Sequence, residues 1–232
     1  MKRVLVIAAH PDDEVLGCGA TMALHAASGD DVSVVLVAEG ITSRSDVRDP
    51  SAVSTELEQL KDSARKANKL LGVHSVSFLA FPDNRLDSVD LLDLIKAVEE
   101  HIGRFHPSTV YTHHGGDLNV DHRCVHQAVM TACRPLQKSS VEEIFLFEVP
   151  SSTEWQLPGH GQPFVPNYFV DVKETLEAKC IALEAYSSEM RPWPHPRSLD
   201  SVRHLAGWRG SNVSLEAAEA FMLGRAIRRL PR

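Results

Sequence analysis

The sequence has few of the features that mark secreted, membrane-spanning or nucleic-acid-binding proteins. Its four cysteines lie far apart with no CxxC pair, so we expect neither a disulfide framework nor a thiolate metal site. No apolar run approaches the ~18 residues of a membrane span. The 24 basic residues are dispersed and outnumbered by 31 acidic ones, for a formal net charge of −7, which argues against a nucleic-acid surface. We therefore expect a small-molecule partner.

Length and hydrophobic content indicate one domain. A chain of 232 residues with 43% hydrophobic content can bury one full core, so we expect a single domain over residues 1–232. The first predicted strand follows directly after residues 1–3, which leaves no room for a signal peptide and predicts a cytoplasmic location. The sequence is compatible with a homo-oligomer and does not determine the oligomeric state.

Apolar segments of strand and helix type alternate along the chain. Strands are expected at 4–7, 31–38, 73–79, 109–112, 142–149 and 168–172, and helices at 15–24, 52–71, 89–105, 123–133, 173–186, 201–208 and 215–228. This alternation predicts a Rossmann-like α/β fold, in which helices flank a mostly parallel sheet, with a C-terminal irregular and helical extension.

The stretch Ala8-Ala9-His10-Pro11-Asp12-Asp13-Glu14 stands between the first strand and the first helix. In open α/β sheets, ligands bind at the edge where strands end. One imidazole and two adjacent carboxylates within four residues are costly neighbours unless a cation lies between them. The alternative is a solvated turn in which an Asp caps the helix.

A second turn, residues 113–122, repeats the order of strand, His/Asp-rich loop and helix. Both loops should therefore open on the same carboxyl edge of the sheet. Taken singly, His113, Asp117 and His126 are expected to be helix caps or surface residues. The convergence of the two loops favours a site over two unrelated turns.

These loops together can supply a catalytic metal centre. His10, Asp13 and His122 make a set of N and O ligands that leaves a position for water, which suits zinc or another divalent transition metal better than Mg²⁺. Asp12 would then be free to act as general base. A metal that polarises a carbonyl beside such a base is suited to amide hydrolysis.

The segments AHPDDE at 9–14 and VDHRCVHQAV at 120–129, with weaker matches at 209–211 and 216–221, resemble the PIG-L/LmbE-type N-acetylglucosaminyl deacetylases. These are zinc-dependent enzymes that remove acetyl groups from amino sugars. The resemblance implies the same ligands and the same base as above. It also implies that Asp121 is an acidic catalytic partner beside the last ligand, and that Asp83 contacts the sugar.

One position departs from the family pattern. The family's His-Pro-Asp-His is replaced here by a segment that begins with Asn119, and the family assigns to the missing His oxyanion stabilisation and protonation of the leaving amine. Asn119 can donate a hydrogen bond to substrate but cannot deliver a proton. We favour His195, held between Pro194 and Pro196, as the substitute acid. The alternatives are that Asp12 carries the proton in both directions, or that this segment is a stiff surface linker.

The predicted function is a zinc-dependent hydrolase, acting on linear amides, that removes the N-acetyl group of an N-acetylglucosamine-type sugar or conjugate. The loops at 39–51, 150–166 and 187–198 should set specificity, with Arg44 as a substrate contact. A nucleotide- or cofactor-binding α/β enzyme is the first alternative, weakened because the first turn lacks GxGxxG. A non-catalytic binding protein on the same fold is the second.

Overall fold

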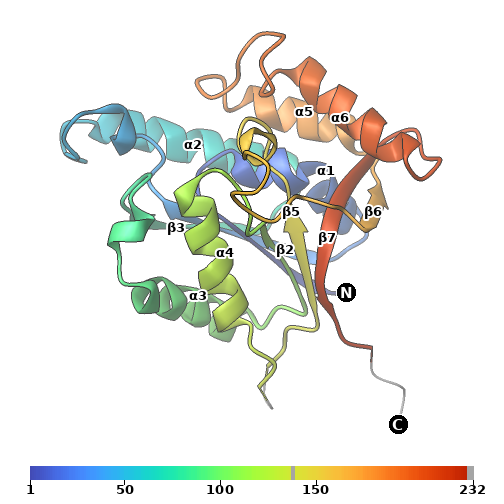
Figure 1. Ribbon diagram of the computed structural model, residues 1–232, viewed down its shortest axis with the longest axis horizontal. Helices are drawn as coiled ribbons and strands as arrows, with labels where there is room; N and C mark the ends of the chain where they lie inside the picture. The colour runs from blue at the N-terminus through green and yellow to red at the C-terminus, as the bar shows by residue number, and fades with distance from the viewer. Residues whose placement is uncertain (137–138, 229–232) are drawn as a thin grey trace.

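The computed structural model describes residues 1–136 and 139–228, and a seven-stranded sheet forms the centre of this part of the chain (Figure 1). The strands lie in the order β3-β2-β1-β4-β5-β7-β6. The first five are parallel, whereas β7 runs antiparallel to β5 and β6. Their bounds are β1 Arg3–Ala8, β2 Asp31–Ala38, β3 Ser75–Phe81, β4 Thr109–His113, β5 Glu143–Phe147, β6 Tyr168–Asp171 and β7 Ala218–Ala226. The predicted α/β class with a mostly parallel sheet is confirmed.

Helices cover both faces of the sheet. Helices α1, α2, α5 and α6 lie on one face and α3 and α4 on the other (Figure 1). Their bounds are α1 Asp13–Ala27, α2 Ser54–Leu70, α3 Leu91–Phe105, α4 Val120–Ala132, α5 Leu176–Glu184 and α6 Leu199–Ser211. Single 3₁₀ turns occur at Thr42–Arg44, Leu86–Ser88 and Thr153–Trp155. No helix within the described ranges combines the length and apolarity needed to cross a bilayer.

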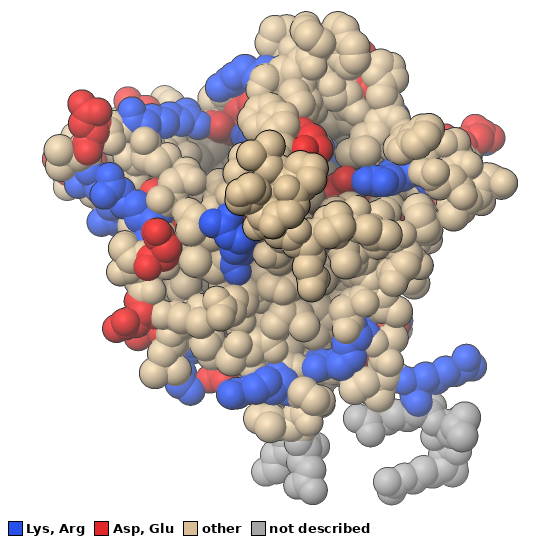
Figure 2. Space-filling model, in the orientation of Figure 1, with Lys and Arg blue, Asp and Glu red and all other residues tan. Residues whose placement is uncertain are grey.

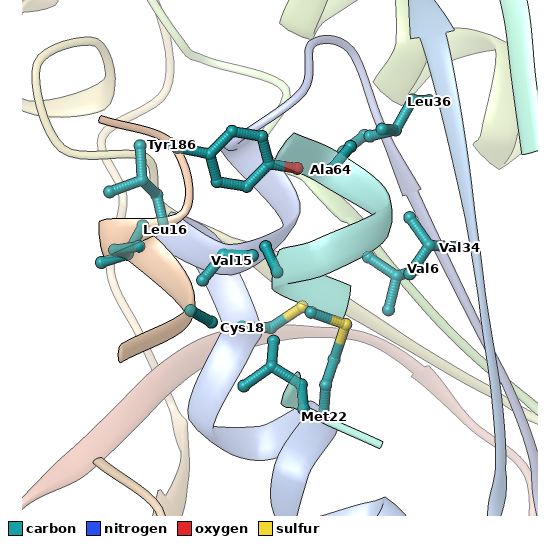
Figure 3. Close-up of a cluster of buried hydrophobic side chains, with 14 of the residues drawn as sticks. Val6, Val15, Leu16, Cys18, Met22, Val34, Leu36, Ala64 and Tyr186 are labelled. Atoms are coloured by element: carbon teal, nitrogen blue, oxygen red, sulfur yellow. The ribbon is translucent and has the colours of Figure 1, made fainter. Parts of the chain in front are cut away.

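Strand β1 is buried on both sides, because successive side chains of a strand point to opposite faces. Val4 and Val6 pack toward α1 and α2, while Leu5 and Ile7 pack toward α3 and α4. Figure 3 shows buried side chains from the face that α1 and α2 cover. Val6 and Tyr186 both belong to this cluster. The strand that leads into the first loop is therefore held firmly from both faces.

The helix predicted at 215–228 is wrong: Ala218–Ala226 is β7, inserted between β5 and β6. The segment is rich in good helix formers, but helix propensities differ by only about 0.7 kcal/mol per residue among ordinary residues. Pairing on both edges and burial of Ala218, Ala220 and Phe221 outweigh this preference. The strand predicted at 168–172 is β6, which lies at one edge of the sheet.

Helix α4 begins at Val120, earlier than the predicted start at Arg123. The side chain of Asn119 caps it by accepting the Asp121 N–H at 2.8 Å. The residue that departs from the family pattern is thus also a helix cap.

Candidate metal and catalytic site

Two loops, residues 9–12 after β1 and 114–119 after β4, meet at the carboxyl edge of the sheet. The strands pair in parallel with Ile7 opposite Thr112, so they end at the same level. Strand β2 pairs with the edge of β1 that faces away from β4, and strand β5 pairs with the edge of β4 that faces away from β1. The space between β1 and β4 is therefore the topological switch point, where open α/β sheets bind ligands.

His10, Asp13 and His122 bring their donor atoms together at this edge. His10 Nδ1 and His122 Nε2 each lie 3.1 Å from Asp13 Oδ2, and one ligand atom from each residue lies within 4.8 Å of the others. Asp13 Oδ1 is buried and has no hydrogen-bond partner in the described part of the chain. Such an orphaned atom is costly, and a cation would satisfy it. The donor set fits zinc or another transition metal.

The charges around the three donors keep Asp13 ionised. Burial alone would raise its pKa, but His122 and His10 hold the pKa of Asp13 well below its usual range. Burial also opposes protonation of His122, yet Asp13 and Asp117 raise the pKa of His122 to about 9. A cation at this point would take over the position that the His122 proton occupies.

Asp121 orients His10 from the opposite side of its ring. Asp121 Oδ2 lies 3.0 Å from His10 Nε2, a contact of the kind that fixes the tautomer of a metal-binding histidine. The same carboxylate accepts the backbone N–H groups of Asn84 at 2.7 Å and Leu86 at 2.9 Å. The resemblance implied an acidic partner beside the last ligand: Asp121 precedes His122 in the sequence, and its carboxylate contacts the first ligand, His10.

Asp117 plays the matching part for His122, with Oδ1 3.1 Å from Nδ1 of that ring. The expectation that Asp117 lies at the surface is wrong, because the residue is fully buried. Its carboxylate does accept a backbone N–H just before helix α4, that of Asn119. Its carboxylate also accepts the hydroxyls of Ser152 and Thr153. Burial opposes ionisation, but these contacts hold the pKa of Asp117 well below its usual range. Its partners come from a distant loop, so sequence spacing gave no signal.

His113 is also buried and not a surface residue. Its Nε2 accepts the backbone N–H of Ala9 at 2.8 Å, and its ring stacks on His122 with a centroid separation of 4.0 Å. Burial lowers the pKa of His113 well below its usual range, so it stays neutral. His126 is half-buried, with Nδ1 2.9 Å from the His113 carbonyl oxygen. His113 therefore ties the first loop to the second.

Asp12 lies beside the three donors and does not share their cluster. Its backbone is left-handed, with φ 110°, a strained conformation for a residue other than glycine. Glu14 Oε2 accepts the Asp12 N–H at 3.0 Å, and Arg197 Nη1 donates to Asp12 Oδ2 at 2.8 Å. Burial raises the pKa of Asp12 well above its usual range, against the opposing charge of Arg197.

The proline-rich segment reaches the site through Arg197. His195 packs edge-on against Trp155, and its Nδ1 accepts the Arg197 N–H at 3.0 Å. His195 does not line the polar cavity that opens over the two loops. Arg197 was not singled out from the sequence, because nothing local shows that a residue so far along the chain contacts Asp12.

A polar cavity of about 140 Å³ opens over the loops and contains the predicted substrate residues Arg44, Asp83 and Asn119. Asp83 accepts the Ser43 N–H at 3.0 Å, and Arg44 Nη2 donates to both carboxylate oxygens of Glu189 at 2.7 Å. The full lining is His10, Pro11, Asp12, Gly40, Ser43, Arg44, Asp83, Asn84, Asn119, Glu189 and Arg197.

The chain belongs to a known family of deacetylases. Residues 5–133, which include both loops, match the PIG-L family of GlcNAc-PI de-N-acetylases. The chain is a member of the PIG-L/LmbE family, as its two motifs predicted.

Three relatives whose names include a deacetylase activity support this membership. The uncharacterized deacetylase YaiS of Escherichia coli K12 is 34% identical over 193 residues, which span 81% of this chain and 91% of that protein. A probable N-acetyl-α-D-glucosaminyl L-malate deacetylase 2 of Bacillus cereus is 27% identical, over 81% and 84%. The diacetylchitobiose deacetylase of Thermococcus kodakarensis is 28% identical, over 82% and 70%.

Solved structures share the fold. The N,N'-diacetylchitobiose deacetylase of Pyrococcus horikoshii matches with a TM-score of 0.72 and 21% identity, over 97% of this chain and 84% of that one. The 4-carboxy-2-hydroxymuconate hydratase GalB of Pseudomonas putida KT2440 matches with a TM-score of 0.77 and 20% identity, over the full length of both. Because a deacetylase and a hydratase share this architecture, the fold alone does not identify the reaction.

Proposed function

We propose that this protein is a metal-dependent N-deacetylase, which hydrolyses the acetamide of an N-acetylglucosamine-type sugar or conjugate to acetate and a free amine. The observation that carries the proposal is the convergence of His10, Asp13 and His122 beside Asp12, with Asp13 Oδ1 buried and unpartnered among the described residues. Relatives named as deacetylases of N-acetylated sugars support the substrate class.

The metal would be zinc or another divalent transition ion held by His10, Asp13 and His122. When bound, it would supply Lewis-acid polarisation of the acetamide carbonyl and of the attacking water.

The chain's own groups would move the protons. Asp12 would accept the proton of the attacking water at its carboxylate, which Arg197 holds in place. The Asn119 side-chain amide has two N–H groups: one donates to Asn84 at 3.0 Å, and the other would donate to the oxyanion. Protonation of the leaving amine would fall to His195 or, if that residue stays away from substrate, to Asp12. Asp83 and Arg44 would contact the sugar hydroxyls from the cavity wall.

The direct test is acetate release by the zinc-loaded protein from N-acetylglucosamine, N,N'-diacetylchitobiose and N-acetylglucosaminyl malate. We expect acetate and free amine in equal amounts from at least one of them, and loss of turnover after treatment with a chelator. A matched control is the same assay on Asp12→Asn, which should retain metal and lose activity. No acetate from any N-acetylated sugar would contradict the proposal, and binding of a nicotinamide cofactor would favour the α/β oxidoreductase alternative.

A further inference from the structure

A short turn after strand β5, residues 151–153, contacts both sides of the proposed metal site. We call it the β5 turn. The Val149 carbonyl accepts the N–H groups of Ser152 at 3.1 Å and Thr153 at 3.0 Å, and the Val149 N–H donates to Thr153 Oγ1 at 2.8 Å. The loop that contains the turn lies at the front of the molecule in Figure 1, where Figure 2 shows a mainly uncharged surface. Ser152 and Thr153 are buried, so their hydroxyls need partners inside the protein.

These two hydroxyls meet the carboxylate of Asp117. Ser152 Oγ donates to one of its oxygens, and Thr153 Oγ1 donates to the other at 2.5 Å. Because Thr153 Oγ1 already accepts the Val149 N–H, its own hydrogen is free to point at the carboxylate. Asp117 Oδ1 lies 3.1 Å from Nδ1 of the proposed ligand His122. Carboxylates in this position orient a ligating histidine, and they are themselves held by hydrogen bonds.

The first residue of the turn reaches the general base through Arg197. Ser151 Oγ accepts the Arg197 Nε–H at 2.7 Å, and Arg197 Nη1 donates to Asp12 Oδ2 at 2.8 Å. A guanidinium is planar and rigid, so the contact at Nε restrains the direction in which Nη1 points. Ser151 makes this contact from a left-handed backbone, φ 71°, which is strained for a residue other than glycine.

We propose that the β5 turn positions a metal ligand and the base of the site together. Through Asp117 it orients His122, and through Arg197 it places Asp12. A fixed separation of ligand and base matters, because a misplacement of about 1 Å can cost about 10²-fold in rate. The inference rests on the proposed deacetylase function and makes all three residues of the turn positioning residues.

The effect on the ligand is tested by zinc affinity, measured by competition with a chromogenic chelator. Ser152→Ala removes the one hydrogen bond of that hydroxyl among the described residues. It should weaken zinc binding about tenfold, the lower end of the range for lost support of a ligating histidine. Thr153→Val should also weaken it, whereas Thr153→Ser keeps the hydroxyl and should bind zinc like the wild type.

Thr109→Val is the matched control for these changes. The Thr109 residue is buried and its hydroxyl also donates to a carboxylate, that of Glu143 at 2.8 Å, but it lies at the first residue of β4, away from the carboxyl edge. This variant should keep both the wild-type zinc affinity and the wild-type kcat.

The effect on the base is tested by kcat for acetate release at saturating zinc. Ser151→Ala removes the hydroxyl that holds Arg197 and should lower kcat about tenfold at unchanged zinc affinity, because the base is less well placed. Ser152→Ala should show the opposite pattern, with weaker zinc binding and a kcat close to that of the wild type once zinc is saturating. A turn that only stabilised the fold would not separate the two quantities in this way.

The inference is overturned if Ser152→Ala binds zinc like the wild type, if Ser151→Ala keeps the wild-type kcat, or if Thr109→Val weakens zinc binding as much as Ser152→Ala. If no N-acetylated sugar releases acetate with the wild type, the proposed function fails on its own, and the zinc titrations still decide the role of the turn. Weaker binding in Ser152→Ala and Thr153→Val alone then supports it, and equal binding in all variants overturns it.

Discussion

Lys179 and Glu219 form a buried ion pair, with Nζ 2.6 Å from Oε1, at the point where helix α1 is interrupted. Cys18 has non-helical backbone angles there, φ −147° and ψ 25°. Lys179 donates to the Leu16 carbonyl at 2.8 Å, and Glu219 accepts the N–H groups of Ala20 and Thr21. The pair thus satisfies backbone groups that lose their helical partners at the break, and it ties α5 and β7 to the helix that carries Asp13.

Lys179→Met should therefore destabilise the fold strongly. The change leaves the Glu219 carboxylate buried without its partner, which typically costs about 3–5 kcal/mol. Lys173→Met is the control, because its 2.6 Å pair with Glu216 is exposed and screened by solvent, so its loss should leave the stability close to that of the wild type. Urea unfolding of the two variants measures the difference. Equal losses of unfolding free energy would show that the break in α1 does not depend on the pair.

His122→Ala should remove the metal. The purified wild type should carry about one zinc-type ion per chain, and the variant should lose both ion and turnover. Because Asp13 and Asp117 raise the pKa of His122 to about 9, the ring carries a proton near neutral pH that the metal must displace. Metal binding should then release a proton and weaken as the pH falls below 9, which calorimetry in buffers of different ionisation enthalpy can detect. Stoichiometric metal retained by His122→Ala would exclude it as a ligand.

Asp12 and Asp13 should respond differently to the same substitution. Asp12→Asn should keep the metal and lower kcat by roughly 10²-fold or more, the usual scale for a lost general base. Asp13→Asn should lose metal affinity, because a neutral amide oxygen is a poorer ligand than a carboxylate. Elemental analysis beside steady-state kinetics separates the two roles, and the reverse pattern would exchange them.

Tyr186→Phe should reveal how Asp12 is held. The Tyr186 hydroxyl donates to Glu14 Oε1 at 2.6 Å, and Glu14 Oε2 accepts the Asp12 N–H; Figure 3 shows the Tyr186 ring embedded between helices. We expect a loss of about 1–3 kcal/mol of stability for the lost bond to a buried carboxylate, together with a lower kcat at unchanged metal content.

Tyr111→Phe is the control for Tyr186→Phe, because it removes a buried tyrosine hydroxyl that does not contact Glu14 or Asp12. Tyr111 is buried and its hydroxyl contacts His25 at 3.1 Å, away from the loops of the site. That variant should lose stability and keep the wild-type kcat. If both variants lower kcat alike, the effect is one of stability and the Tyr186–Glu14 contact does not position the base.

The sequence could predict the parts of this structure that depend on local patterns. The order of strands and helices up to β5, and the loops that carry His10 and His122, follow from apolar spacing and from residues at strand ends. β7 could not be predicted, because pairing with β5 and β6 overrides the helix propensity of its own residues. Asp117 and Arg197 were missed for a related reason, since each acts through a partner on a distant segment.

The proton donor for the leaving amine is the remaining question that mutagenesis can answer. Asn119 cannot deliver a proton, and its oxygen already caps α4 by accepting the Asp121 N–H. His195 stays our predicted acid, because a positioned imidazole N–H can donate a proton to a leaving amine. In the structure its Nδ1 accepts the Arg197 N–H, so Nε2 is the ring nitrogen that would deliver the proton. His195→Ala should then lower kcat at least tenfold while zinc content stays at the wild-type level.

Arg197→Lys distinguishes this role from the positioning of Asp12. Lysine keeps one positive charge but lacks the fork through which Arg197 contacts both Asp12 and Ser151. We expect a moderate fall in kcat for Arg197→Lys and a larger one for Arg197→Ala. Should His195→Ala match the wild type while both Arg197 variants are impaired, the segment acts through Arg197 alone, and Asp12 would both accept the proton of water and return it to the amine.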